Sequence, residues 1–413
     1  MLLSHPLRER VVAEMLLRRF PAIEAPVELV QVVRLVPSDE RDAERSLVQQ
    51  MPQPVIPAVG ERHVAGITPD GVQMLWERHS EASTSTLLLT PGAKRQTYFD
   101  WLERLPGQAV RAIRIALVRE EIDAEEALAE AAFAPEDLVT CHIGLSRIWS
   151  DFRIGNDGYG RMVVAANGVL PADLGRLLQR LQELGNYRNL ALLGLPLAQE
   201  FGPRLDRLET QLSEHAAAIA DGQSDDELLL DALSDLSAEL AHVSSATAFR
   251  MGATRAYAAI AADRLAGLDV RAIPGHQSLL DFTGRRLLPA VRTCATFIER
   301  IDALEARAAR VTALLRARIE TRIERQNRDL LHSVERGIGL QVRLQHLVES
   351  LSVLAISYYA IGLVGYLTKG LAKEIPSFSS ELVTAIAVLP VTSAIFLFIR
   401  RQRRSLLADA HHG

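Results

Sequence analysis

The chain has 413 residues, of which 48% are hydrophobic and 23% charged, and its formal net charge is −5. This length gives room for two or three domains, and the composition excludes a transporter with many spans, which would be far more apolar. The negative net charge gives no indication of nucleic-acid binding, and the charged residues are spread along helices in the way typical of solvated faces.

The first residues, MLLSHPLRERVVAEM, contain neither a long apolar segment nor a small-residue cleavage site. They do not resemble a signal peptide, so we expect the body of the protein in the cytoplasm. The two cysteines of the sequence, Cys141 and Cys294, form no zinc-binding pattern. Buried free thiols in a reducing compartment are favoured over a disulfide between them.

Residues 1–168 are predicted to form a cytoplasmic α/β domain, which gives the whole chain an α+β fold. VELVQVVRLV and LVTCHIGLS are apolar, β-branched runs of strand length. The stretch DGVQMLWERHSEASTSTLLLT is interpreted as one long strand or as two strands joined by a bend. A hairpin is predicted around Asn156, Asp157 and Gly158, which tolerate positive φ between two strand-like runs. Two short helices, TYFDWLERLPG and DAEEALAEAAF, are expected between strands.

Residues 169–346 are predicted to form a helical domain. Its first helix is expected to begin at Pro171, and a second to cover residues 224–268. An unusually long stalk helix follows and runs into the next domain. The residues with coiled-coil-like spacing along it are Ile301, Leu304, Ala308, Val311 and Leu315. Gly337 and Gly339 interrupt the pattern, either as tolerated weak points or as a hinge, and both interpretations stay open.

A transmembrane hairpin is predicted over residues 347–399, with spans at 347–367 and 382–399, because about 20 apolar residues are needed to cross a bilayer. The arginine-rich stretch RRQRR opens a basic tail, 400–413, and an excess of lysine and arginine marks the cytoplasmic side. We therefore expect both termini on the cytoplasmic side of a bacterial inner membrane, with the lipid bilayer as a partner.

The first span carries two stripes of side chains with different expected roles. Candidate pore-facing residues are Ser350, Ser357, Ile361, Val364 and Thr368. The other stripe, whose residues are mostly small and suit close helix packing, contains Ala355, Tyr358, Gly362 and Gly365. No charged residue lies in mid-span, although an intramembrane charge is the usual mark of ion transport. The hydroxyl groups are therefore interpreted as packing groups in preference to pore groups.

The segment WERHSE places Glu77, His79 and Glu81 at alternating positions, which point to one face of a strand. Such a row can bind a metal or transfer protons, but an exposed sheet face with paired charges is the favoured interpretation. Asp151 and Arg153 are expected near the row as pairing partners. Trp76 points the other way and is expected in the core.

The sequence contains no recognisable catalytic motif. GNDGYG lies between two strands, whereas a dinucleotide site needs a helix after the glycines, and neither a P-loop nor a G-x-S-x-G segment occurs. His411 and His412 lie in the tail without a pattern of metal-binding partners. We therefore expect no enzyme activity, no cofactor and no metal.

Six segments spread over nearly the whole chain carry a family resemblance: HPLRERVVAEM, WERHSE, DFRIGNDGYGR, RMGATRAY, PAVRTC and VESLSVLAISYYAIGLVGYLTKGL. They resemble a bacterial membrane-anchored family known as domain of unknown function thirty-four twenty-two. The segment EMLLRRFP, residues 14–21, lacks the histidine and the first proline of the expected E-x-H-A-R-P-F-P, so no role of that histidine carries over. The resemblance implies a membrane topology and no mechanism.

The order of the elements also resembles the CorA-type magnesium channels, homopentamers whose first span lines the pore and ends in a Gly-Met-Asn motif. Here GLVGYLTKG stands at that place, so magnesium selectivity is not implied. Two hypotheses follow. The preferred mechanism is a homo-oligomeric CorA-like cation channel or transporter, gated by the long helix. The alternative is a membrane-tethered cytoplasmic sensor or scaffold whose hairpin is only an anchor.

Overall fold

The computed structural model describes residues 4–9, 11–12, 20–51, 62–222, 225–372 and 380–409. Its contacts divide the chain into two compact units, Met1–Thr312 and Ala313–Gly413. The border predicted at residue 168 falls inside the first unit, because the following helices and one later strand pack onto the sheet. Most of the segment EMLLRRFP, together with His411 and His412, lies outside the described residues.

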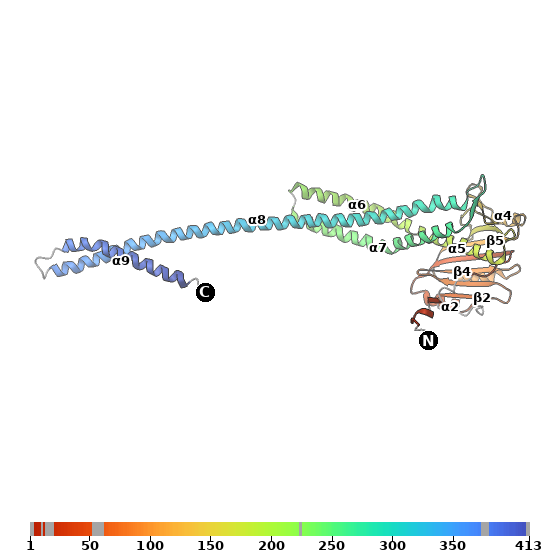
Figure 1. Cartoon of the computed structure of the whole chain (residues 1–413), viewed down its shortest axis with the longest axis horizontal. Helices are drawn as coiled ribbons and strands as arrows, with labels where there is room; N and C mark the ends of the chain where they lie inside the picture. Colours follow the sequence, from red (N-terminus) through yellow and green to blue (C-terminus); the bar gives the residue numbers. More distant parts are fainter. Residues whose placement is uncertain are drawn as a thin grey trace. The chain divides into compact units, whose positions relative to one another are not determined.

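The first unit is built around one sheet, which has nine strands within the described residues (Figure 1). The strand order is β2-β3-β4-β1-β5-β8-β7-β6-β9, and neighbours are antiparallel except β5 and β8. The strands are β1 (Val27–Leu35), β2 (His63–Ile67), β3 (Gln73–Arg78), β4 (Ala82–Leu89), β5 (Gln108–Val118), β6 (Val139–Ile143), β7 (Ser146–Ser150), β8 (Gly160–Ala165) and β9 (Val270–Ala272). Together with the long helices that follow, this sheet confirms the predicted α+β class.

The stretch DGVQMLWERHSEASTSTLLLT forms two strands joined by a tight connection. β3 ends at Arg78 and β4 begins at Ala82, and the His79 N–H donates to the Ala82 carbonyl at 2.7 Å. Trp76 is buried as expected, and its indole N–H donates to the Glu44 carboxylate at 3.0 Å. Every residue of β4 is buried, because apolar clusters lie on both faces of the sheet at this strand.

Helices cover both faces of the sheet. The short helices α2 (Arg41–Val48) and α3 (Arg95–Arg104) pack on one face, and α4 (Ala124–Ala131) packs beside β8. The longer α5 (Pro171–Leu192) lays its leucine face on the opposite side of the sheet. This burial of apolar surface holds α5 in place and gives about 25 cal/mol for each Å² removed from water.

The helical region begins at Pro171, as predicted, where proline's fixed φ suits the first turn of α5. Two long helices follow, α6 (Gly194–Asp221) and α7 (Asp226–Ala266), and α7 packs against both α5 and α6. Asp225 caps α7, since its side chain accepts from the Glu227 N–H at 3.0 Å. After α7 the chain returns to the sheet as β9, which pairs with β6.

The long helix α8 (Leu279–Ala372) begins ahead of Pro289, which lies inside it. Within the first unit, Ile301, Leu304 and Ala308 of the predicted seam are buried. Arg300 donates to the Asp206 carboxylate of α6 at 2.6 Å, which places this segment beside α6 of the same chain. A coiled coil with further copies stays a prediction.

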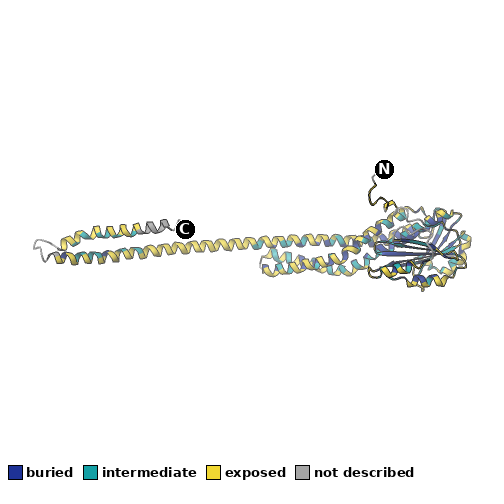
Figure 2. Ribbon diagram, turned by 90° about the horizontal axis from the view of Figure 1, so that it is seen from below, coloured by how far each residue is buried: buried dark blue, intermediate teal, exposed yellow. Residues whose placement is uncertain are grey.

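The second unit contains the rest of α8 and the helix α9 (Ser380–Asp409). Figure 2 shows that most residues of these two segments are exposed, in contrast to the buried strands of the first unit. α8 continues through Gly337 and Gly339, where an added Cβ would meet no atom within 4 Å, and a hinge at these glycines stays a prediction. The start of the predicted basic tail is helical, because α9 continues past Arg400.

Two glycines of α6 offer a matched test of the packing between α6 and α7 in the first unit. An added Cβ at Gly194 would overlap the side chain of Thr254, whose hydroxyl donates to the Ala191 carbonyl at 3.0 Å. We expect Gly194→Ala to lower the free energy of unfolding by about 1–3 kcal/mol, because overpacking pushes α7 away. The Cβ added by Gly202→Ala would meet no atom within 4 Å, so this variant should raise the free energy of unfolding by up to about 1 kcal/mol. Urea denaturation that shifts both variants in the same direction would contradict this account.

Candidate functional site

The three residues of the predicted polar row lie on the side of the sheet that α5 covers, but they do not form one site. Glu77 and His79 line a small cavity of about 60 Å³ between the sheet and α5. Glu81 is held instead by Arg250 of α7, in a bidentate ion pair at 2.7 and 2.9 Å. α5 covers the face that was interpreted as exposed. Among the described residues, no group of three His, Cys, Asp or Glu side chains is placed to hold a metal ion.

The contacts of this row join two of the segments that carry the family resemblance. The His79 ring meets the Tyr187 ring edge-on, with 6.3 Å between centroids, and Tyr187 stacks on Tyr257 at 5.8 Å. The Ser80 and Tyr257 hydroxyls lie 3.3 Å apart. Together with the Glu81 ion pair, these contacts fasten WERHSE to RMGATRAY of α7.

Asp151 and Arg153 do not pair with this row, so that prediction is wrong. Arg153 forms an ion pair with Asp137 at 2.6 Å. Asp151 accepts from the backbone N–H of Ala134 at 3.2 Å and from that of Arg153 at 3.1 Å. Both side chains therefore stabilise the connection that follows β7, away from the row.

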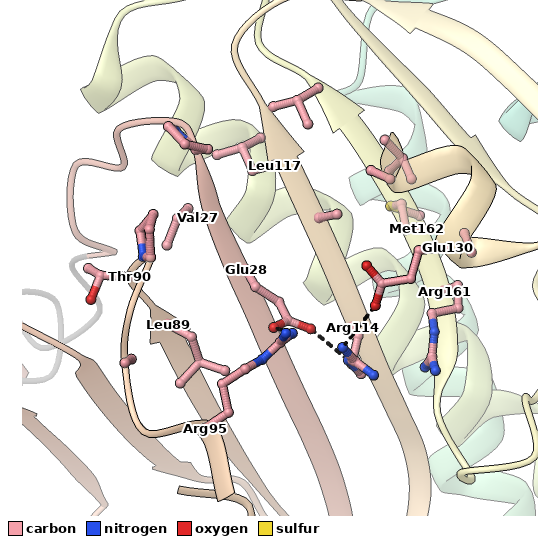
Figure 3. Close-up of a pocket in the computed structure, with 18 of the residues that line it drawn as sticks. Val27, Glu28, Leu89, Thr90, Arg95, Arg114, Leu117, Glu130, Arg161 and Met162 are labelled. Carbon is pink, nitrogen blue, oxygen red and sulfur yellow. Dashed lines mark hydrogen bonds and ion pairs between the residues drawn. The ribbon is translucent and has the colours of Figure 1, made fainter. Parts of the chain in front are cut away.

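A larger cavity of about 310 Å³ lies over β1, β5 and β8, on the side of the sheet that α3 and α4 cover (Figure 3). Its size is typical of a small-molecule site. Glu28 lies between two arginines: it accepts from Arg114 at 2.6 Å and forms an ion pair with Arg95. Burial lowers the pKa of Arg95, and the charge of Arg114 is the next cause.

The remaining charges at this cavity are also paired. Arg114 lies 3.7 Å from Glu130 and 3.5 Å from Asp157. Arg161 pairs with Asp157 at 2.7 Å. Each arginine of the cavity therefore has a carboxylate partner within the protein, and the positive and negative charges of the network balance each other.

Two arginines on the α5 side of the sheet have a different environment. Arg111 of β5 and Arg188 of α5 are each 9% exposed, and both line a cavity of about 130 Å³ beside the β7–β8 connection. One nitrogen of Arg111 donates to three amide oxygens, those of Gln31, Gln182 and Asn186, at 3.0, 2.7 and 2.8 Å. Gly185 makes this close approach to α5 feasible, because a Cβ there would lie 2.7 Å from the guanidinium.

Arg188 is held by aromatic rings. Its guanidinium lies 4.5 Å from the centroid of Phe152 and 5.3 Å from that of Phe282. No hydrogen bond or ion pair connects it to another residue of the described ranges. Burial lowers the pKa of Arg188 to about 10, with Arg286 as a further cause, and the pKa of Arg111 to about 9, with Arg188 as a further cause. Both values lie above neutral pH, so both groups carry a positive charge there.

The residues predicted for the membrane hairpin lie on two sides of α8. Ser357 and Thr368 are 5% and 7% exposed, and Thr368 lies 3.1 Å from the Thr384 hydroxyl of α9. Ile361 and Val364 are half-buried on the same side, whereas Ser350 is exposed and donates to the His346 carbonyl at 2.6 Å. The Thr368 hydroxyl therefore lies at the contact between α8 and α9 of one chain, and the Ser357 side chain is buried.

The residues predicted for helix packing have mixed positions. Ala355 and Tyr358 are exposed, and an added Cβ at Gly362 would meet nothing within 4 Å. At Gly365 the added Cβ would lie 3.6 Å from Thr384, so this glycine is next to α9. Whether the exposed members pack against other helices, or any of these residues lines a pore, stays a prediction.

The two helices of this hairpin are long and apolar enough to cross a membrane, and only 6% and 0% of their apolar windows are buried. The family described as Protein of unknown function (DUF3422) matches residues 3–406. The chain belongs to this family. This match confirms the resemblance seen in the sequence. No curated protein matches the chain, and the resemblance to CorA-type channels has no support from the comparisons.

Sequence patterns did not single out the arginines of this DUF3422 chain. Arg111 and Arg114 stand three positions apart in β5, where they suggest solvent contact, but helices cover both faces of the strand. Arg188 lies on a helix rich in polar residues. The signal that was available is Phe152, which directly follows Asp151 in the segment DFRIGNDGYGR and carries the ring under Arg188.

Glu28 allows a test of the paired network in the larger cavity. We expect Glu28→Gln to lower the free energy of unfolding by about 1.5–3 kcal/mol, because two arginines lose a carboxylate whose side chain is 15% exposed. Glu130→Gln is the control: its side chain is 70% exposed, and we expect a loss below about 1 kcal/mol. Equal losses for the two variants in chemical denaturation would show that Glu28 does not hold the network together.

Proposed function

We propose that this protein is a membrane-tethered cytoplasmic sensor or scaffold, with the α8–α9 hairpin as its anchor and the first unit as its working part. The observation that carries the proposal is the position of the hydroxyl groups in the hairpin. Thr368 faces α9 of the same chain, where it lies within hydrogen-bond distance of Thr384, and Ser357 is buried about three turns earlier on the same side of α8. Hydroxyl groups that meet inside the hairpin are not available to line a water path.

The outward faces of the hairpin suit contact with lipid. The large apolar and aromatic side chains that are exposed on α8 in this region are Leu351, Leu354, Tyr358, Tyr359, Leu363, Tyr366 and Leu367. Apolar side chains in water would cost free energy, whereas lipid tails accept them. Arg400 and Arg401 directly follow the second apolar segment, which by the charge rule sets the end of α9 on the cytoplasmic side. We place the hairpin in a bacterial inner membrane, with both termini in the cytoplasm.

Ion flux distinguishes the tether from the CorA-like channel. We expect the full chain, reconstituted in liposomes, to release no more K⁺ or Mg²⁺ than protein-free liposomes do. The channel hypothesis instead predicts a flux that falls in Ser357→Leu and persists in Tyr358→Leu, whose side chain is 76% exposed. That pattern would overturn the tether.

The anchor itself can be tested by fractionation of cells. We expect the full chain in the membrane fraction after alkaline carbonate washing, because two apolar helices of this length insert stably. A chain that ends after residue 346 lacks both apolar segments, and we expect it in the soluble fraction. Recovery of the full chain in the soluble fraction would contradict the proposed membrane insertion.

A further inference from the structure

The cavity beside Arg111 and Arg188 differs from the cavity beside Glu28 in its charge balance. In the Glu28 cavity each arginine pairs with a carboxylate of the protein. Arg153 and Arg161 also line the cavity beside Arg111 and Arg188, and they pair with Asp137 and Asp157. Arg111 and Arg188 themselves have no carboxylate of the described residues within ion-pair distance. A buried charge is unfavourable unless a partner of opposite sign is present, and two buried charges of the same sign also repel each other.

The backbone beside Arg188 is held in an unusual conformation. Phe152 has a φ of 56°, in the left-handed region that large side chains rarely adopt. This conformation places its ring against Arg188, and the ring stacks on Phe282 of α8 at 4.2 Å. Conformations of this kind cluster at ligand-binding sites, where the surrounding structure holds them. The strain at Phe152 is therefore an observation, independent of the charges, that points to the same place.

Aromatic rings orient the guanidinium of Arg188, and its N–H groups are not used for this. Its contacts are with the faces of two rings, so its N–H groups make no hydrogen bond within the described residues. Hydrogen bonds hold Arg111, because one of its nitrogens donates to Gln31, Gln182 and Asn186. Two positioned cations with donors to spare are the arrangement in which arginine binds oxyanions by pairs of parallel hydrogen bonds.

We propose that the cavity between Arg111, Arg188 and the β7–β8 connection binds a small oxyanion: inorganic phosphate or the phosphate group of a small ester. Its volume of about 130 Å³ suits a group of this size. Asn189 also lines the cavity, and an asparagine amide group can donate to an anion. The anion would supply the negative charge that Arg111 and Arg188 lack within the described residues. This site lies wholly in the first unit and does not depend on the proposed membrane anchor.

Isothermal titration calorimetry of the full chain in detergent tests the proposal, with inorganic phosphate in one arm and glycerol phosphate in the other. We expect at least one of them to bind. Arg188→Gln should weaken that binding at least roughly tenfold, because charge-assisted hydrogen bonds are lost. Arg95→Gln is the matched control, because it removes an arginine from the Glu28 cavity. The Kd of this variant should stay within about twofold of the wild-type value, because Arg95 makes no contact with the proposed site.

The outcomes separate the alternatives. Binding of glycerol phosphate alone supports the ester, and binding of both anions supports a site for the phosphate group itself. Where Arg188→Gln does not fold, Arg188→Lys keeps the charge but loses the planar fork, and weaker binding with an unchanged melting temperature supports the site. The proposal is overturned if neither anion binds at millimolar concentration, or if Arg95→Gln weakens binding as much as Arg188→Gln.

Discussion

The packing of α5 against the sheet is the interaction on which the first unit depends. Its leucines Leu174, Leu178 and Leu184 are buried against apolar residues of the sheet. The same helix carries Gln182, Asn186 and Arg188, which face the two smaller cavities. The interface between α5 and the sheet therefore supplies both the apolar contacts that hold the unit together and the polar groups that line its smaller cavities. α7 then packs on α5 and fixes its position through Arg250 and Tyr257, which reach the β3–β4 connection.

Charge is distributed differently on the two sides of the sheet. On the α3 side, Glu28 and its neighbours balance the arginines, so the charges around this larger cavity are paired within the protein. On the α5 side, amide oxygens and aromatic rings take the place of carboxylates around Arg111 and Arg188. Amide oxygens and aromatic rings orient a guanidinium group, but they do not neutralise its positive charge. The volume of the cavities and the balance of charge around them therefore point to different places in this protein.

Local patterns predicted the parts of this fold that depend on local physics. The start of α5 at Pro171, the turn at Asn156–Gly158 and the core position of Trp76 follow from backbone preference and apolar spacing, and the structure has all three. β5 was not among the predicted strands, because arginines interrupt its apolar run and their buried partners are distant in sequence. The pairing of β6 with β9 joins segments more than a hundred residues apart, and no local pattern encodes it. The same reason explains why Arg188 escaped notice: its partners Phe152 and Phe282 come from a loop and a helix on either side of α5 in the sequence.

The polar chemistry of the two units bears on whether the hairpin conducts or only anchors. Conduction through a bilayer requires a continuous polar path, since a charge in hydrocarbon is strongly unfavourable. In the described part of the hairpin, the polar side chains with the lowest exposure are Ser357 and Thr368, and Thr368 meets Thr384 of α9. The two buried arginines that have no carboxylate partner among the described residues, by contrast, lie at α5 in the first unit. An anchor needs nothing from the hairpin except apolar outer faces and a stable contact between two helices, and Thr368 with Thr384 provides such a contact.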